Sequence, residues 1–340
     1  MERLVSISWN AAVGRWAPGL GPRIAIMDAE RLLSEEQSYR EMSFAVPWGV
    51  IAAKEWGRDD GKPFLGLHGF LDNANTFDRL ARLLPEDIHF ICIDFPGHGK
   101  SSHRWPGMPY IHFEYIADIK KVISQLKWEK YSIIGHSMGA NLAALYAGTF
   151  PCEVENLILL DFRGPSTYPV DKAAVVLARY ATAMAQVQTT SLHVYPNLES
   201  AAKRRQLKAV GGTMLTKEDA VLLAKRGTCT TKNGLVFSND PIIKHLYVPL
   251  VAPQQLLLSI LSKIQCAVLT LEATDTVFET NKVSWMERIN IICQSAKFKL
   301  CKKIKGGHHF HLENPGQVVQ EIKGFLTLCQ SYDCTLNSKL

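Results

Sequence analysis

The sequence lacks the patterns of a disulfide-stabilised, zinc-binding or membrane-spanning chain. Its eight cysteines are scattered, with no CxxC pair, which favours reduced intracellular thiols. No apolar run approaches the roughly 20 residues needed to cross a bilayer, because Lys263 interrupts the longest stretch, near Leu256–Leu271. The net charge of +6, from 38 basic and 32 acidic residues, forms no basic stripe. These absences predict a soluble protein with no nucleic-acid partner and no membrane span.

The rest of the composition is that of a folded chain, since 47% of the 340 residues are hydrophobic and 21% are charged. Over residues 43–162, and again over 265–330, short apolar runs of strand length alternate with helical patterns. This alternation predicts an α/β core in which helices cover both faces of a mostly parallel sheet. A tail follows at 331–340.

The alternation breaks over residues 163–264, which we interpret as a helical cap inserted into the α/β chain. Helical apolar spacing recurs there at Asp171–Gln188, Leu198–Val210 and Lys217–Arg226. Residues 1–42 precede the core as an extension. A loosely ordered tail or a helix near Ala29–Gln37 is favoured there over a transit peptide.

A G-x-S-x-G motif, Gly135-His-Ser137-Met-Gly139, lies between an apolar strand pattern and an apolar helix. Small residues on both sides of Ser137 permit the sharp strand-to-helix turn that exposes a serine hydroxyl. The amino end of the following helix helps to stabilise negative charge beside it. Ser137 is therefore the candidate nucleophile, and it requires a base.

The candidate base is His308, because two glycines at 306 and 307 mark a loop late in the chain that could carry an imidazole back over the sheet. His309 and His311 are the alternatives. A metal site at the three histidines is disfavoured, because no second cluster of ligands lies nearby in the sequence.

The acid that orients this imidazole is expected at a strand end. Asp275 follows the strand pattern that ends at Leu271, and Asp161 follows the one that ends at Leu160. Asp275 is the preferred candidate and Asp161 the alternative, although either acid could instead cap a helix.

An oxyanion hole needs two donors, for which we expect the N–H groups of Met138, directly after the nucleophile, and of Phe70, in the turn after His68-Gly69. His68 itself is expected to be structural. The glycine-rich loop at 94–102 has no G-x-x-x-x-G-K-[ST] pattern, so it is interpreted as a structural loop.

Four segments together resemble the α/β-hydrolase superfamily, and within it the serine hydrolase-like proteins: HGFLDN at 68–73, DFPGHGKSS at 94–102, GHSMGA at 135–140 and GGHHFHLENP at 306–315. The resemblance implies an eight-stranded, mostly parallel sheet with a helical cap after the sixth strand, and a triad of Ser137, His308 and an acid. The superfamily commonly has glycine where this chain has Glu272, so the identity of the acid is less secured by the resemblance.

The chain ends in Ser338-Lys339-Leu340, the tripeptide that the peroxisomal import receptor binds. The sequence therefore predicts that the protein enters peroxisomes, with the cytoplasm as a second location.

Together these features predict a serine hydrolase, without cofactor or metal, that acts on a small-molecule acyl substrate and cleaves its carboxylic ester or thioester bond through an acyl-enzyme. The alternatives are a peroxisomal acyl-CoA thioesterase, whose ligand could meet the basic run Lys203–Arg205, and a non-catalytic binding protein.

Overall fold

The computed structural model describes residues 39–164, 167, 170–185, 192–207, 213–243, 247–248, 253–276 and 282–337. The chain from Tyr39 onward is one compact unit. In the described ranges, no helix has both the length and the apolar character that crossing a bilayer requires. The helix expected near Ala29–Gln37 and the tripeptide Ser338–Leu340 lie outside these ranges.

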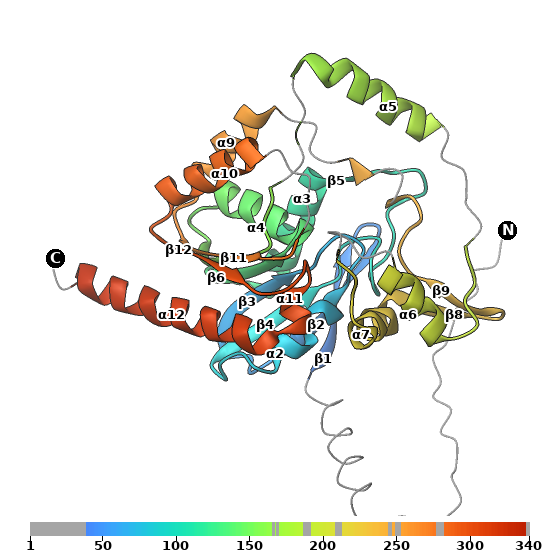
Figure 1. Cartoon of the computed structure of the whole chain (residues 1–340), viewed down its shortest axis with the longest axis horizontal. Coiled ribbons are helices and arrows are strands. Elements are labelled where there is room, and N and C mark those ends of the chain that lie inside the picture. Colours follow the sequence, from blue (N-terminus) through green and yellow to red (C-terminus); the bar gives the residue numbers. More distant parts are fainter. Residues whose placement is uncertain are drawn as a thin grey trace, which may run out of the picture. The chain divides into compact units, whose positions relative to one another are not determined.

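One eight-stranded sheet forms the centre of the unit, with the strand order β1-β2-β4-β3-β6-β7-β11-β12 (Figure 1). β1 and β2 form a hairpin, and β2 is also antiparallel to β4, whereas all other neighbours are parallel. The predicted eight-stranded, mostly parallel sheet is therefore confirmed. The strands are β1 (Arg40–Val46), β2 (Gly49–Trp56), β3 (Lys62–Leu67), β4 (Ile88–Ile93), β6 (Tyr131–His136), β7 (Val154–Leu160), β11 (Ala267–Ala273) and β12 (Phe298–Ile304).

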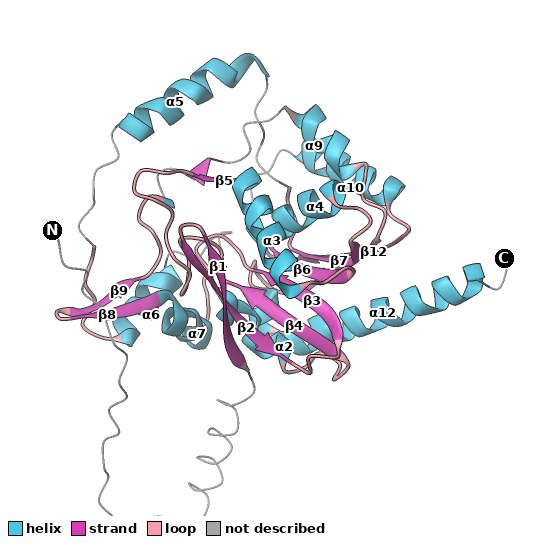
Figure 2. Cartoon of the chain, turned by 180° about the vertical axis from the view of Figure 1, so that it is seen from behind, coloured by secondary structure: helices cyan, strands magenta, loops and turns pink. Residues whose placement is uncertain are grey.

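Helices cover both faces of this sheet (Figure 2). α3 (His112–Leu126), α4 (Met138–Thr149), α9 (Gln254–Leu261) and α10 (Lys282–Ser295) pack on one face. The other face carries η1 (Ala74–Phe77), α2 (Asp78–Ala81), α11 (Phe310–Glu313) and α12 (Pro315–Asn337). α4 is apolar nearly all round because it is buried on nearly all sides.

The segment between β7 and β11 carries small elements at the edge of the core. Before α9, the described elements of this segment are η2 (Val170–Lys172), α5 (Ala173–Ala185), α6 (Leu198–Leu207), α7 (Lys217–Gly227), β8 (Thr228–Thr231), β9 (Gly234–Phe237) and β10 (Tyr247–Val248). β10 pairs with β5 (Tyr110–Ile111), which precedes α3. β8 and β9 form a hairpin. α6 and α7 share a small apolar cluster that includes Leu215 and Leu223.

Three boundaries differ from those expected from the sequence. β1 begins at Arg40, three residues before the expected start of the core. α9 falls in the expected cap range, yet its Leu257 and Leu261 belong to the core cluster that includes α4. α12 continues as helix to Asn337, through most of the expected tail. The bounds of these elements follow packing, which local composition does not show.

Candidate active site

Ser137 occupies a strained turn between β6 and α4. Its φ of 53° and ψ of −112° are rare for a residue with a side chain, and such strain costs about 1–3 kcal/mol. The turn also forces its neighbours together, because a Cβ on Gly135 would lie 2.5 Å from the carbonyl oxygen of Gly139. A Cβ on Gly139 would lie 2.0 Å from the carbonyl oxygen of Leu67. The two glycines of the motif are therefore required by packing.

His308 connects the serine to a carboxylate. Its Nε2 lies 2.9 Å from the Oγ of Ser137, and its Nδ1 lies 2.6 Å from the Oδ2 of Asp161. An ionised carboxylate only accepts hydrogen bonds, so Nδ1 carries the proton and Nε2 presents a lone pair to the serine hydroxyl. The loop is held in place because the His308 N–H donates to the Oγ1 of Thr213, at 3.0 Å.

Burial lowers the pKa of His308 to about 4, although its hydrogen bond to Asp161 acts in the opposite direction. The ring of His308 is 1% exposed, whereas Ser137 is partly open to solvent. His308 is therefore neutral at ordinary pH and can accept a proton from the serine.

Asp161 is fully buried directly after β7, with a φ of 48°. Beside His308, its carboxylate accepts hydrogen bonds from the Ala273 N–H, at 3.2 Å, and the Thr276 hydroxyl, at 3.1 Å. It also accepts one from Arg163, at 2.9 Å. Burial alone would raise the pKa of Asp161, but the hydrogen bond from His308 and the positive charge of Arg163 lower it. The carboxylate is therefore ionised where it meets the imidazole.

The structure places the alternative acid, Asp161, against His308, and not the preferred Asp275. Asp275 is exposed, and the hydrogen bond described for its carboxylate comes from Thr274, at 2.8 Å. β7 and β11 are neighbouring parallel strands in which Leu160 pairs with Leu271. Both acids therefore follow the same edge of the sheet. Asp161 lies one residue past that edge, under the imidazole, whereas Asp275 lies four residues past it in a turn.

The expected oxyanion donors, Phe70 and Met138, belong to two segments that meet where Gly139 packs on Leu67. The carbonyl of Gly69 accepts hydrogen bonds from the Nδ1 of His68, at 2.7 Å, and from the Asp72 N–H, at 3.1 Å. Because the carbonyl and N–H of a trans peptide point in opposite directions, this arrangement turns the Phe70 N–H away from His68. The role of Phe70 and Met138 as donors stays a prediction.

His68 uses both ring nitrogens in this turn. Its Nδ1 donates a hydrogen bond to the carbonyl of Gly69, and its Nε2 accepts one from the Phe95 N–H, at 2.9 Å. Burial lowers the pKa of His68 to about 4. The ring is therefore a neutral structural element, as expected from the sequence.

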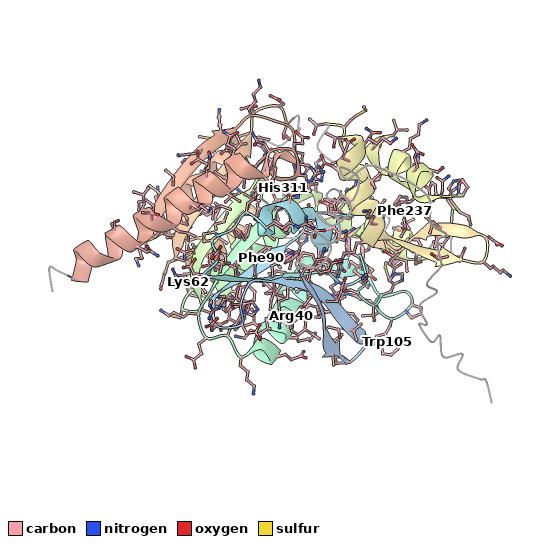
Figure 3. The ribbon with its side chains drawn as sticks, turned by 90° about the horizontal axis from the view of Figure 1, so that it is seen from below. Arg40, Lys62, Phe90, Trp105, Phe237 and His311 are labelled. Carbon is pink, nitrogen blue, oxygen red and sulfur yellow. The ribbon has the colours of Figure 1, made fainter. Side chains whose placement is uncertain are left out.

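The other histidines around His308 do not reach the serine. The centroid of the His136 ring lies 4.1–4.9 Å from those of His308, His309 and His311, with the ring planes tilted against one another. His309 bonds to Asp72, at 3.2 Å, and His311 to the Oγ1 of Thr76, at 2.8 Å. Figure 3 labels His311 on α11, where it is fully buried. His308 is thus the one of the three candidate bases that meets Ser137.

Asp72, His136 and His309 form a buried cluster whose ligand atoms lie within 4.8 Å of one another, so their chemistry could suit a metal ion. However, the guanidinium of Arg205 already binds the carboxylate of Asp72. It neutralises the one negative charge of the cluster, and a divalent cation there would face an adjacent buried cation. The cluster is therefore better explained as a charge-compensated support for the histidine loop.

Two buried arginines on the cap helices attach the cap to the core, and the sequence analysis missed their burial. Arg205 on α6 binds Asp72, and Arg226 on α7 binds Asp94, at 2.8 Å, and Glu41 of β1, also at 2.8 Å. The Asp94 carboxylate also accepts hydrogen bonds from backbone N–H groups, which supports the structural interpretation of the loop at 94–102. In the sequence these arginines look like ordinary surface charges, because their partners lie more than 100 residues away.

Comparisons with known proteins show the family to which the chain belongs. Residues 62–187 match a family model described as the alpha/beta hydrolase fold. A serine hydrolase-like protein from Danio rerio is 34% identical, over 84% of this chain and 88% of the relative. Serine hydrolase-like protein 2 from Homo sapiens is also 34% identical, over 84% of this chain and 93% of the relative.

A solved structure is also similar to this chain: a hypothetical protein from Pseudomonas aeruginosa PAO1, with a TM-score of 0.73 and 33% identity, over 84% of this chain and 99% of that one. The family that the sequence motifs resemble is confirmed by these matches. The chain therefore belongs to the serine hydrolase-like proteins of the alpha/beta hydrolase family.

Proposed function

We propose that this protein is a serine hydrolase that cleaves a carboxylic ester or thioester. The observation that carries the proposal is the continuous hydrogen-bonded chain from the Oγ of Ser137 through His308 to Asp161, with distances of 2.9 and 2.6 Å. The same order of nucleophile, imidazole and buried carboxylate performs acyl transfer on several unrelated folds.

In this mechanism His308 removes the hydroxyl proton of Ser137 as the oxygen attacks the carbonyl carbon. The negative charge on the carbonyl oxygen is stabilised by the N–H groups of Met138 and Phe70. His308 then gives its proton to the departing alcohol or thiol, which leaves an acyl-serine. Water, activated by the same imidazole, releases the carboxylic acid and restores Ser137.

A fluorophosphonate probe tests the nucleophile directly, because it reacts with activated serines and does not require knowledge of the substrate. We expect the wild type to be labelled, and Ser137→Ala to lose the labelling. Ser124→Ala, which changes an exposed serine on α3, is the matched control and stays labelled. A folded wild type without labelling, or a labelled Ser137→Ala variant, would contradict the proposal.

The leaving group distinguishes an esterase from an acyl-CoA thioesterase. Of the basic run considered for a phosphorylated ligand, Arg205 is buried against Asp72, and Lys203 and Arg204 are exposed. Two cations therefore remain for such a contact, and solvent-exposed cations are common without a ligand. Parallel assays on acyl-CoA and aryl ester panels of matched chain length, with Ser137→Ala as the blank, identify the class.

We also propose that the protein enters peroxisomes through its last three residues. α12 ends at Asn337, and its last described side chains, Ser331 and Tyr332, are exposed, which supports an accessible end. With a fluorescent protein fused to the amino terminus, deletion of residues 338–340 is expected to abolish punctate localisation, whereas Asn337→Ala preserves it. Punctate localisation of the deleted chain would overturn this proposal.

A further inference from the structure

Arg163 gives Asp161 an unusual environment for an acid that orients an imidazole. Its Nη2 donates to the Oδ1 of Asp161 at 2.9 Å, while His308 holds the other carboxylate oxygen at 2.6 Å. One fully buried carboxylate thus lies between a permanent cation and the imidazole that becomes a cation during the reaction.

The guanidinium is fixed in this position. Arg163 is 20% exposed, and the indole of Trp285 lies beside its guanidinium at 5.5 Å. Its own carbonyl accepts a hydrogen bond from Arg288, at 3.1 Å. Trp285 in turn donates to the carbonyl of Phe162, at 3.1 Å. Trp285 and Arg288, both on α10, therefore hold the segment after β7 from one side, so the ion pair is not a loose surface contact.

We propose that Arg163 is a positioning residue that sets the basicity of His308 through the carboxylate that the two side chains share. The inference rests on the proposed function, since it concerns the base of that reaction. Asp161 stabilises an imidazolium at His308, and a fixed cation on the same carboxylate opposes it. Arg163 therefore keeps His308 neutral, and able to accept a proton, at lower pH.

Other titratable and charged groups also act on His308, and a comparison of Arg163 variants must leave them unchanged. His136 approaches from β6, while His309 and His311 approach from the loop and α11. The ion pair of Asp72 and Arg205 lies next to these histidines. Glu272 on β11 interacts electrostatically with Asp161 and Arg163. Within this set Arg163 is the cation bonded directly to Asp161, so its removal changes the charge felt by His308 most directly.

The test uses the full chain with Arg163→Met, which removes the charge but keeps much of the side-chain length, and Arg163→Lys, which keeps the charge. Arg179→Met removes an exposed charge on α5 and is the matched control. The titration of the His308 ring is followed by NMR, assigned by its absence in His308→Asn, with circular dichroism at each pH to confirm folding. We expect the midpoint to rise by about one pH unit in Arg163→Met. It stays near the wild-type value in Arg163→Lys and Arg179→Met.

The rate of fluorophosphonate labelling gives the second readout. The acid limb of its pH profile is expected to move to higher pH by the same amount in Arg163→Met. An unchanged midpoint, or a loss of rate that is equal at all pH values, would show a purely structural role and overturn the inference. Because the ring titrates whether or not the protein hydrolyses anything, a wild type that is not labelled would instead contradict the proposed function.

Discussion

Asp161→Asn is expected to lower kcat by about 10⁴-fold, because an amide cannot stabilise the imidazolium and holds His308 in the wrong tautomer. The amide NH₂ would donate to Nδ1, so Nε2 would carry the proton and could not accept one from Ser137. Hydrolysis of an ester identified in the substrate panel measures the effect, with circular dichroism to confirm that the variant folds.

Asp275→Asn is the matched control, since it makes the same chemical change at the other strand-end acid. Its carboxylate is exposed and bonded to Thr274, so we expect kcat to stay within about twofold of the wild type. A large loss in Asp275→Asn together with a small loss in Asp161→Asn would reverse the assignment.

The stability of the protein is expected to fall steeply as the pH decreases below about 6.5, because the interior holds several neutral histidines. Burial lowers the pKa of His98 to about 3 and that of His68 to about 4, and it also lowers the pKa of His309. The unfolded chain binds protons at these groups below their ordinary pKa of 6.5, whereas the folded chain does not. Each such histidine therefore removes about 1.4 kcal/mol per pH unit from the free energy of unfolding, between pH 6.5 and its folded-state pKa.

His98→Asn tests this expectation in a single side chain. The Nδ1 of His98 donates to the carbonyl of Pro96, at 3.1 Å, and an asparagine amide can replace that donor without titrating. Urea unfolding between pH 7 and pH 5 should show a pH dependence shallower by about 1.4 kcal/mol per unit, whatever the absolute stability of the variant. Ser124→Ala, which changes an exposed side chain without a titratable group, is the control and should keep the wild-type slope. Equal slopes in all three proteins would refute the assignment of His98 as a source of acid instability.

The parts of the site that could be predicted from the sequence are those that depend on short segments. The turn at Ser137 is specified by glycines two residues away on either side, and His308 by the glycines before it. The sheet follows from the alternation of apolar strand and helix patterns, which is also a local signal.

The acid could not be predicted in the same way, because it depends on the register of two strands far apart in the chain. The pairing of Leu160 with Leu271 brings both candidate acids to one edge. The path of the His308 loop then selects between them, and no short segment specifies that path. The burial of Arg205 escaped prediction for a similar reason, since it depends on Asp72, 133 residues earlier in the chain.

The bond from Arg226 to Glu41 makes the first strand part of the support of the cap. A chain shortened by proteolysis or by a later start site to begin after residue 41 would leave Arg226 with Asp94 as its remaining carboxylate partner. Loss of a few residues at the amino-terminal edge of the sheet would therefore weaken the attachment of α7, which begins at Lys217, more than 170 residues later. A shortened chain that begins at Tyr39 keeps Glu41 and Asp94, the two carboxylate partners of Arg226.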